Sequence, residues 1–146
     1  MSETAGRKLW LHSMRLYALL TEAQCRGGWL ETARGLLEGG ADVIQLREKD
    51  VADGELLQRA RALRRLADRY ESGFVVNDRP DIAILSGADG VHLGQRDLPP
   101  DEVRDVFGPD LIIGVSTHSV DQLETAEARG ADYVGVGPVF ATTTKG

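Results

Sequence analysis

The segment Val43-Ile44-Gln45-Leu46-Arg47-Glu48-Lys49-Asp50 decides the fold, because an apolar run changes abruptly into a group of charged side chains. Four further segments repeat this pattern, at residues 74–79, 91–97, 111–118 and 133–145. A short apolar run bounded by polar residues is typical of a parallel strand buried on both faces. The sequence therefore predicts an α/β protein with one site at the carboxyl ends of its strands.

The same pattern, applied to the rest of the chain, predicts six strands with helices between them. The strands are expected at 16–20, 43–46, 74–76, 90–93, 111–115 and 133–136. The segments between the strands show the apolar periodicity of helices. Asp53 is expected to be the N-cap of the helix after the second strand, and Ser119 with Gln122 is expected to form a capping box at the helix before the sixth strand. The tripeptide Gly-Ala-Asp recurs before three of the strands, at residues 40–42, 87–89 and 130–132. We expect one domain over residues 1–146, built from about six βα units, with residues 1–15 as an N-terminal leader.

Composition narrows the class of protein. The chain has 146 residues, 42% of them hydrophobic, which is enough to build a core. A net charge of −6 argues against a nucleic-acid surface. Neither a signal peptide nor a run of about 20 apolar residues for a membrane span is evident. Cys25 is the only cysteine, which excludes an internal disulfide and fits a reducing cytoplasm.

Basic side chains alternate along the second strand and its extension. A period of two places Gln45, Arg47 and Lys49 on one face and directs Glu48 to the other, toward the helices. Arginine and lysine at the mouth of a barrel suit phosphate oxygens. The alternative is that the strand ends at Leu46 and the charged residues form a solvated loop.

Two aspartates follow neighbouring strands. Asp78 and Asp97, with phosphate oxygens and water, would form a typical Mg²⁺ site. Alternatively, Asp78 caps the helix that begins at Pro80, and Asp97 is an ordinary loop acid. The amide of Asn77 offers donors and an acceptor to the edge of a heterocycle.

The hydroxyl groups after the last two strands favour binding of an anion. Ser116 and His118 lack the context of a nucleophile and its base, so we expect Ser116 to donate a hydrogen bond to a ligand phosphate. His12 and His92 lack metal-ligand spacing. The loop after the sixth strand combines hydroxyls with an ammonium group, at Thr142, Thr143, Thr144 and Lys145.

In this order, the motifs resemble those of the thiamine phosphate synthase family. The matching pieces are VIQLREKD, VVNDRPDIA, DGVHLGQRDLP, IIGVSTHS and DYVGVGPVFATTTKG, and the likeness spans residues 16–146. It implies the TIM (β/α)₈ barrel fold and a Mg²⁺-dependent transferase. The enzyme joins hydroxymethylpyrimidine diphosphate to a thiazole phosphate, giving thiamine phosphate and pyrophosphate.

The resemblance also implies roles for particular residues. The pyrimidine diphosphate would lie on the segment from Gln45 to Lys49, Glu48 included, and on Asn77, Ser116 and Lys145. Mg²⁺ would be held by Asp78 and Asp97. The thiazole phosphate would contact Thr142, Thr143 and Thr144.

The family pattern continues with two further strands, so we expect this chain to be a C-terminally truncated copy. Such a chain would leave open sheet edges, and we expect it to fold poorly or to self-associate, and to be feebly active at best. Three alternatives remain open. The chain is a thiazole tautomerase of the same superfamily, a non-catalytic fragment that binds the pyrimidine diphosphate, or another phosphate-binding barrel. The tautomerases usually lack the full set that includes Gln45, Arg47 and Lys49.

Overall fold

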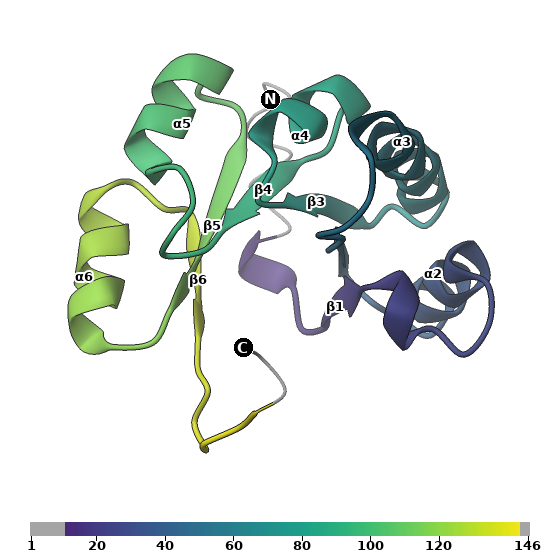
Figure 1. Ribbon diagram of the computed structural model, residues 1–146, viewed down its shortest axis with the longest axis horizontal. Coiled ribbons are helices and arrows are strands. Elements are labelled where there is room, and N and C mark those ends of the chain that lie inside the picture. Colours follow the sequence, from purple (N-terminus) through teal and green to yellow (C-terminus); the bar gives the residue numbers. More distant parts are fainter. Residues whose placement is uncertain (1–10, 144–146) are drawn as a thin grey trace.

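The computed structural model describes residues 11–143 and contains one curled sheet of six parallel strands. The strands pair in sequence order, and helices cover the outer side of the curl (Figure 1). Their bounds are β1 Tyr17–Leu20, β2 Val43–Leu46, β3 Gly73–Asn77, β4 Gly90–Leu93, β5 Ile112–Thr117 and β6 Tyr133–Val136. All six predicted strands are present, within two residues of the expected bounds. Over the described residues the fold is part of a TIM-barrel type, with five βα units followed by a sixth strand.

The helices start and stop where local chemistry dictates. A short 3₁₀ turn, η1, spans Glu22–Gln24, and the α-helices are α2 Trp29–Glu38, α3 Asp53–Arg69, α4 Pro80–Ser86, α5 Pro100–Phe107 and α6 Val120–Ala128. Pro80 and Pro100 each open a helix, where the missing N–H costs nothing. Of the predicted leader, residues 11–15 are described, and 11–13 are helical.

Of the two predicted helix caps, the one at α3 is formed by a different residue and the one at α6 is only partly as expected. Asp53 is not the N-cap of α3; Ala52 is, and the Asp53 carboxylate instead accepts a hydrogen bond from Arg79 at 2.8 Å. Ser119 does cap α6 by accepting the Gln122 N–H. The Gln122 side chain, however, accepts the N–H of His118 and not that of Ser119, so the capping box is shifted by one residue.

The sheet separates two layers of different chemistry. On its outer side, Ile44, Leu46, Phe74 and Val76 pack with α2, α3 and α4 into one apolar core. Alternation along the strands directs the intervening residues to the inside of the curl, where polar and aromatic side chains collect. The outer layer therefore forms the main apolar core, and the inner side combines buried Val43, Val75 and Ile112 with polar and aromatic side chains.

The Gly-Ala-Asp repeat binds pairs of strands at the end opposite the predicted site. Asp42 accepts the N–H of Leu16 at 2.9 Å, Asp89 that of Phe74 at 2.8 Å, and Asp132 that of Ile113 at 2.9 Å. Each carboxylate thus ties the start of an even-numbered strand to the preceding odd-numbered one. Arg64 and Arg104 pair with the second and third of these aspartates. The repeat has a structural function once in every two βα units.

The sheet edges are formed by β1 and β6. Residues of β6 and the loop after it are much more exposed than those of β2 to β5; Val136 is 70%, Val139 84% and Phe140 85% exposed. Within residues 11–143, none of the helices has the length and apolar content that crossing a membrane requires.

Candidate functional site

The site lies where β2, β3 and β4 end. The strand β2 ends at Leu46, so the predicted extension of the strand through Lys49 is wrong, although the Arg47 N–H still donates to the carbonyl of Leu20 on β1. The alternating directions nevertheless persist. The charges of Lys49 and Arg47 reach the carboxyl group of Asp78, which belongs to the loop after β3. An open groove of about 430 Å³ runs along the loops after β1 and β2, lined by Thr21, Glu22, Ala23, Arg47, Glu48, Lys49, Asp50 and Val51.

Asp78 and Asp97 are brought together, as the sequence predicted. Desolvation, the largest cause, acts together with the hydrogen bond and the negative charge of Asp97 to raise the pKa of Asp78 from 3.8 to about 6. Lys49 and Arg47 oppose this shift without cancelling it. Asp78 also has a left-handed backbone, with a φ of 64°. Non-glycine residues in this region are uncommon and are concentrated at functional sites.

Of the structural roles considered for the two aspartates, helix capping by Asp78 is not observed, whereas Asp97 does form a hydrogen bond within its own loop. Asp78 does not cap α4, because Arg79 occupies the N-cap position and no side-chain cap is formed. Asp97 does organise its loop, since its Oδ2 accepts the N–H of Gly94 at 2.6 Å. A Cβ at residue 94 would lie 3.0 Å from that oxygen, so glycine lets the backbone approach the carboxylate closely. Asp97 therefore keeps one carboxylate oxygen for contacts outside its own loop.

The donor set at this rim fits Mg²⁺. Two adjacent carboxylates with unresolved mutual repulsion are stabilised by a divalent cation, and hard oxygen ligands are those that Mg²⁺ prefers. Among residues 11–143 there is no cluster of three or more His, Cys, Asp or Glu side chains arranged for a metal. Two protein carboxylates are the number typical of Mg²⁺ sites in which substrate phosphates and water complete the shell.

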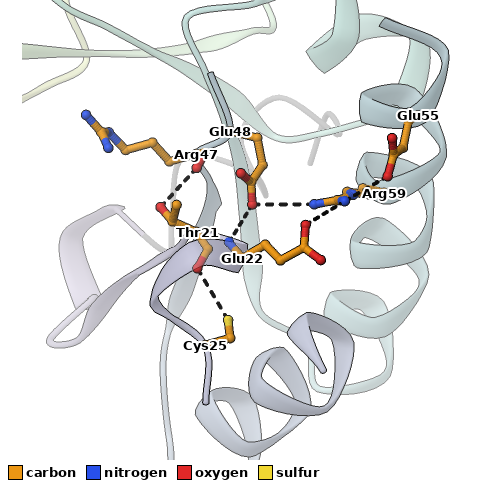
Figure 2. A network of polar contacts seen from close by, with 7 residues as sticks. All are labelled: Thr21, Glu22, Cys25, Arg47, Glu48, Glu55 and Arg59. Carbon is orange, nitrogen blue, oxygen red and sulfur yellow. Dashed lines mark hydrogen bonds and ion pairs between the residues drawn. The ribbon is translucent and has the colours of Figure 1, made fainter. Parts of the chain in front are cut away.

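Glu48 is separated from the basic side chains. Its carboxylate accepts the N–H of Glu22 at 2.6 Å and lies 3.6 Å from Nη1 of Arg59 on α3. Figure 2 shows Arg47 pointing away from this carboxylate. The expectation that Glu48 faces the helices is correct. Its assignment to the pyrimidine diphosphate is not supported by this geometry, because the carboxylate is held by the fold.

A relay of hydrogen bonds crosses the interior below the rim. The Gln45 amide donates to the Tyr17 hydroxyl at 2.8 Å, and that hydroxyl lies 2.7 Å from the hydroxyl of Tyr133. His92 bridges Tyr133, at 3.1 Å, and Ser116, at 2.8 Å. The relay joins β1 to β6, so two predicted substrate ligands, Gln45 and Ser116, are held by one network.

Tyr17, His92 and Tyr133 were not predicted from the sequence as members of the site. Burial raises the pKa of both tyrosine hydroxyls, that of Tyr133 strongly, so both are neutral at physiological pH. A Cβ at Gly114 would overlap the ring of Tyr133, so glycine at that place in β5 is what admits the ring. These three residues could have been recognised in the sequence, because each is a polar or aromatic residue at an inward position of an otherwise apolar strand.

The remaining predicted residues are placed as follows. Asn77 ends β3, half-buried, on the inward side by alternation with Val76. Thr142 and Thr143 are exposed in the loop after β6, which extends beyond the end of that strand (Figure 1). Thr144 and Lys145 lie outside the described residues. His118 contacts the carbonyl of Gly137, where the chain turns into this loop.

Fold and site together define a βα-barrel protein with a rim of paired carboxylates facing basic side chains. The model of the family "Thiamine monophosphate synthase" matches residues 16–146. A thiamine-phosphate synthase of Shouchella clausii is 48% identical over 132 residues, covering 90% of this chain and 63% of the relative. One of Synechocystis is 52% identical, covering 80% of this chain and 34% of the relative. The solved thiamine phosphate pyrophosphorylase from Pyrococcus furiosus superposes with a TM-score of 0.82 at 38% identity, covering 88% of this chain and 62% of that one.

The chain belongs to the thiamine monophosphate synthase family. It spans less than two thirds of the length of these relatives. A ribulose-1,5-bisphosphate carboxylase/oxygenase from Pyrococcus horikoshii superposes with a TM-score of 0.62 at 17% identity, a likeness that concerns the fold alone.

Proposed function

We propose that the chain carries thiamine-phosphate synthase chemistry, in which hydroxymethylpyrimidine diphosphate and thiazole phosphate combine to give thiamine phosphate and pyrophosphate. The observation that supports this most is the meeting of Asp78 and Asp97 within reach of the charges of Lys49 and Arg47. The relatives from Shouchella clausii and Synechocystis are both thiamine-phosphate synthases. We place the reaction in the cytoplasm, with small phosphorylated substrates and without nucleic acid or membrane as partners.

The residues of the rim suit the departure of a diphosphate. The bond between the pyrimidine methylene carbon and the diphosphate oxygen breaks, and its electron pair leaves with pyrophosphate. The thiazole nitrogen then gives its lone pair to that carbon, so no protein nucleophile is needed. Arg47 and Lys49, with Lys145 as a further candidate, neutralise the leaving group. Asp78 and Asp97 would hold Mg²⁺, which would supply further neutralisation of charge.

The other candidates have narrower roles. Asn77 and Ser116 hold the pyrimidine diphosphate from the ends of β3 and β5, and Gln45 belongs to the segment from Gln45 to Lys49 that binds the same substrate. Thr142, Thr143 and Thr144 contact the thiazole phosphate. Of these, Ser116 has the clearest support, because His92 fixes its hydroxyl at the rim.

Release of pyrophosphate tests this function directly. The chain is mixed with both substrates and Mg²⁺, and pyrophosphate is measured against time. We expect Asp97→Asn to lower the rate roughly 10²–10³-fold, by analogy with the loss of one oxyanion donor. Asp105→Asn, an exposed carboxylate on α5, is the matched control and retains the rate. Binding of the pyrimidine diphosphate without release would identify a binding fragment, and conversion of the thiazole alone would identify a tautomerase.

We also infer that copies of this chain associate through the edge at β6. Its exposed apolar side chains, Val136, Val139 and Phe140, lie beside an edge of the sheet, and such edges favour pairing with another chain. Sedimentation over a range of concentrations tests this. We expect Phe140→Lys to shift the distribution toward monomer. A wild-type chain that stays monomeric at all concentrations would refute the association.

A further inference from the structure

Arg59 of α3 lies outside the predicted site but reaches both loops that form its basic edge. Its side chain is only 10% exposed. Nη2 lies 2.7 Å from an oxygen of Glu22, in the turn after β1, and 2.7 Å from an oxygen of Glu55 on the same helix. Nη1 faces Glu48, in the segment after β2, at 3.6 Å. One guanidinium therefore contacts three carboxylates from three parts of the chain (Figure 2).

The two loops are also bound directly to each other. The Glu48 carboxylate accepts the backbone N–H of Glu22 at 2.6 Å, and the Thr21 hydroxyl donates to the carbonyl of Arg47 at 3.0 Å. The Arg47 N–H donates to the carbonyl of Leu20 at 2.9 Å. The backbone that presents Arg47 and Lys49 is thus held on one side by the turn after β1. Glu48 lies between these two residues and carries the link to the helix.

The charge balance makes Arg59 the group on which this arrangement depends. Glu48 has a side chain only 9% exposed, and an isolated buried carboxylate is costly unless a cation compensates it. The guanidinium carbon also lies 5.4 Å from the centroid of the Trp29 ring on α2, within the range of a cation–π contact. A lysine ammonium in its place has no planar fork and cannot face several carboxylates in this way.

We propose that Arg59 is a positioning residue for the diphosphate site. Through Glu48 and Glu22 it fixes the loops after β1 and β2, so that Arg47 and Lys49 are presented to the leaving diphosphate. It touches no substrate itself. This inference rests on the proposed function for its ligand, but the positioning of the loops is measurable without any ligand. By analogy with the partners that orient metal ligands, whose loss costs roughly 10–100-fold in affinity, we expect a measurable loss of affinity without Arg59.

The same helix supplies a matched control. Arg64 has a side chain 17% exposed, pairs with Asp89 at 2.9 Å and lies 5.8 Å from the centroid of the Phe74 ring. Its partner lies at the opposite end of the strands, where Asp89 accepts the N–H of Phe74. Arg59→Met and Arg64→Met therefore each remove a largely buried, aromatic-stacked guanidinium from α3, one beside the rim and one away from it.

Amide exchange, followed by NMR on the whole chain, separates local positioning from general stability. The Glu22 N–H reports the Glu48 contact, and the Phe74 N–H reports the Asp89 contact. We expect Arg59→Met to speed exchange at Glu22 about tenfold and to leave Phe74 unchanged, and Arg64→Met to do the reverse. Arg59→Lys, which keeps the charge, is expected to fold and to give an intermediate rate at Glu22. If Arg59→Met does not fold, the exchange rate at Glu22 in Arg59→Lys decides whether Arg59 positions the loops.

Calorimetric titration with the pyrimidine diphosphate and Mg²⁺ supplies the second readout. We expect about tenfold weaker binding for Arg59→Met and a change of less than about twofold for Arg64→Met. Equal losses in the two variants, or an unchanged Glu22 exchange rate in Arg59→Met, overturn the proposal. If the wild-type chain binds no pyrimidine diphosphate, the proposed function fails, and the exchange rates alone decide whether Arg59 holds the loops.

Discussion

Replacement of Asp78 by asparagine is expected to stabilise the fold while it removes a candidate metal ligand. In the folded chain, burial and the nearby Asp97 raise the pKa of Asp78 from 3.8 to about 6. The folded state therefore keeps this proton to a higher pH than the unfolded state does. Stability accordingly falls as the pH rises from about 4 to about 6, and the loss is complete above that range. Asparagine carries no charge, so the variant does not suffer this loss.

The magnitude follows from the size of the shift. About two pH units at about 1.4 kcal/mol each set a ceiling of about 3 kcal/mol. The carboxyl group is only half-buried, so solvent screening reduces the expected gain to about 1 kcal/mol at pH 7.5. The left-handed backbone, with φ at 64°, does not oppose the change, because asparagine tolerates this region as well as aspartate does.

Urea denaturation followed by circular dichroism measures this gain. Unfolding free energies are compared at pH 4.5 and 7.5, without Mg²⁺, for the wild type, Asp78→Asn and the exposed control Asp105→Asn. We expect a gain for Asp78→Asn at pH 7.5 that shrinks at pH 4.5, and a change within about 0.5 kcal/mol for the control. A loss of stability at pH 7.5, or a gain that does not depend on pH, would refute the argument that Asp78 is held against charge repulsion.

Three further outcomes follow from the contacts described above. Gly114→Ala, whose Cβ overlaps the Tyr133 ring, is expected to cost about 1–3 kcal/mol in urea denaturation. Gly135→Ala, whose Cβ would lie 3.8 Å from the His92 ring, is its matched control and should cost less than about 1 kcal/mol. Asp89→Ala leaves the buried Phe74 N–H without its acceptor and should cost about 2–3 kcal/mol, whereas the exposed Asp105→Ala should be nearly neutral. Chelation of Mg²⁺ should weaken the binding of the pyrimidine diphosphate, measured by calorimetry, at least about tenfold in the wild type and have little effect in Asp78→Asn. Equal affinities of the wild type with and without chelator would contradict the assignment of Asp78 and Asp97 as metal ligands.

The positions of the strands could be predicted because the relevant signals are local. Val43–Leu46, Gly90–Leu93 and Tyr133–Val136 are bounded by glycine or charged residues that stop an apolar run, and the structure places all three at the expected bounds. The meeting of Asp78 and Asp97 was predictable for a related reason. Parallel neighbouring strands bring the residues that follow them to the same edge, whatever the side-chain details.

The interior relay could not be predicted, because it depends on how far the sheet curls. Tyr17 and Tyr133 are 116 residues apart and belong to the two edge strands, yet their hydroxyls lie 2.7 Å apart. Strand twist and helix packing decide that distance, and neither is written in a local pattern. The role of Arg59 was hidden for the same reason. Helical periodicity places Arg59 on α3, but only the packing of α3 against β2 shows that it meets Glu48.

The two ends of the strands differ in how their charges are satisfied, and this difference explains where function can arise. At the amino-terminal end, Asp89 and Asp132 each accept a backbone N–H and pair with an arginine, so their charge is balanced within the fold. At the carboxyl-terminal end, Asp78 has a raised pKa and a left-handed backbone, both of which the fold must tolerate. A native structure keeps such a costly group only where the surrounding contacts over-determine it. A bound divalent cation would remove the repulsion, so the same carboxylates that weaken the unliganded chain would bind that cation, and the cation in turn would attract a diphosphate.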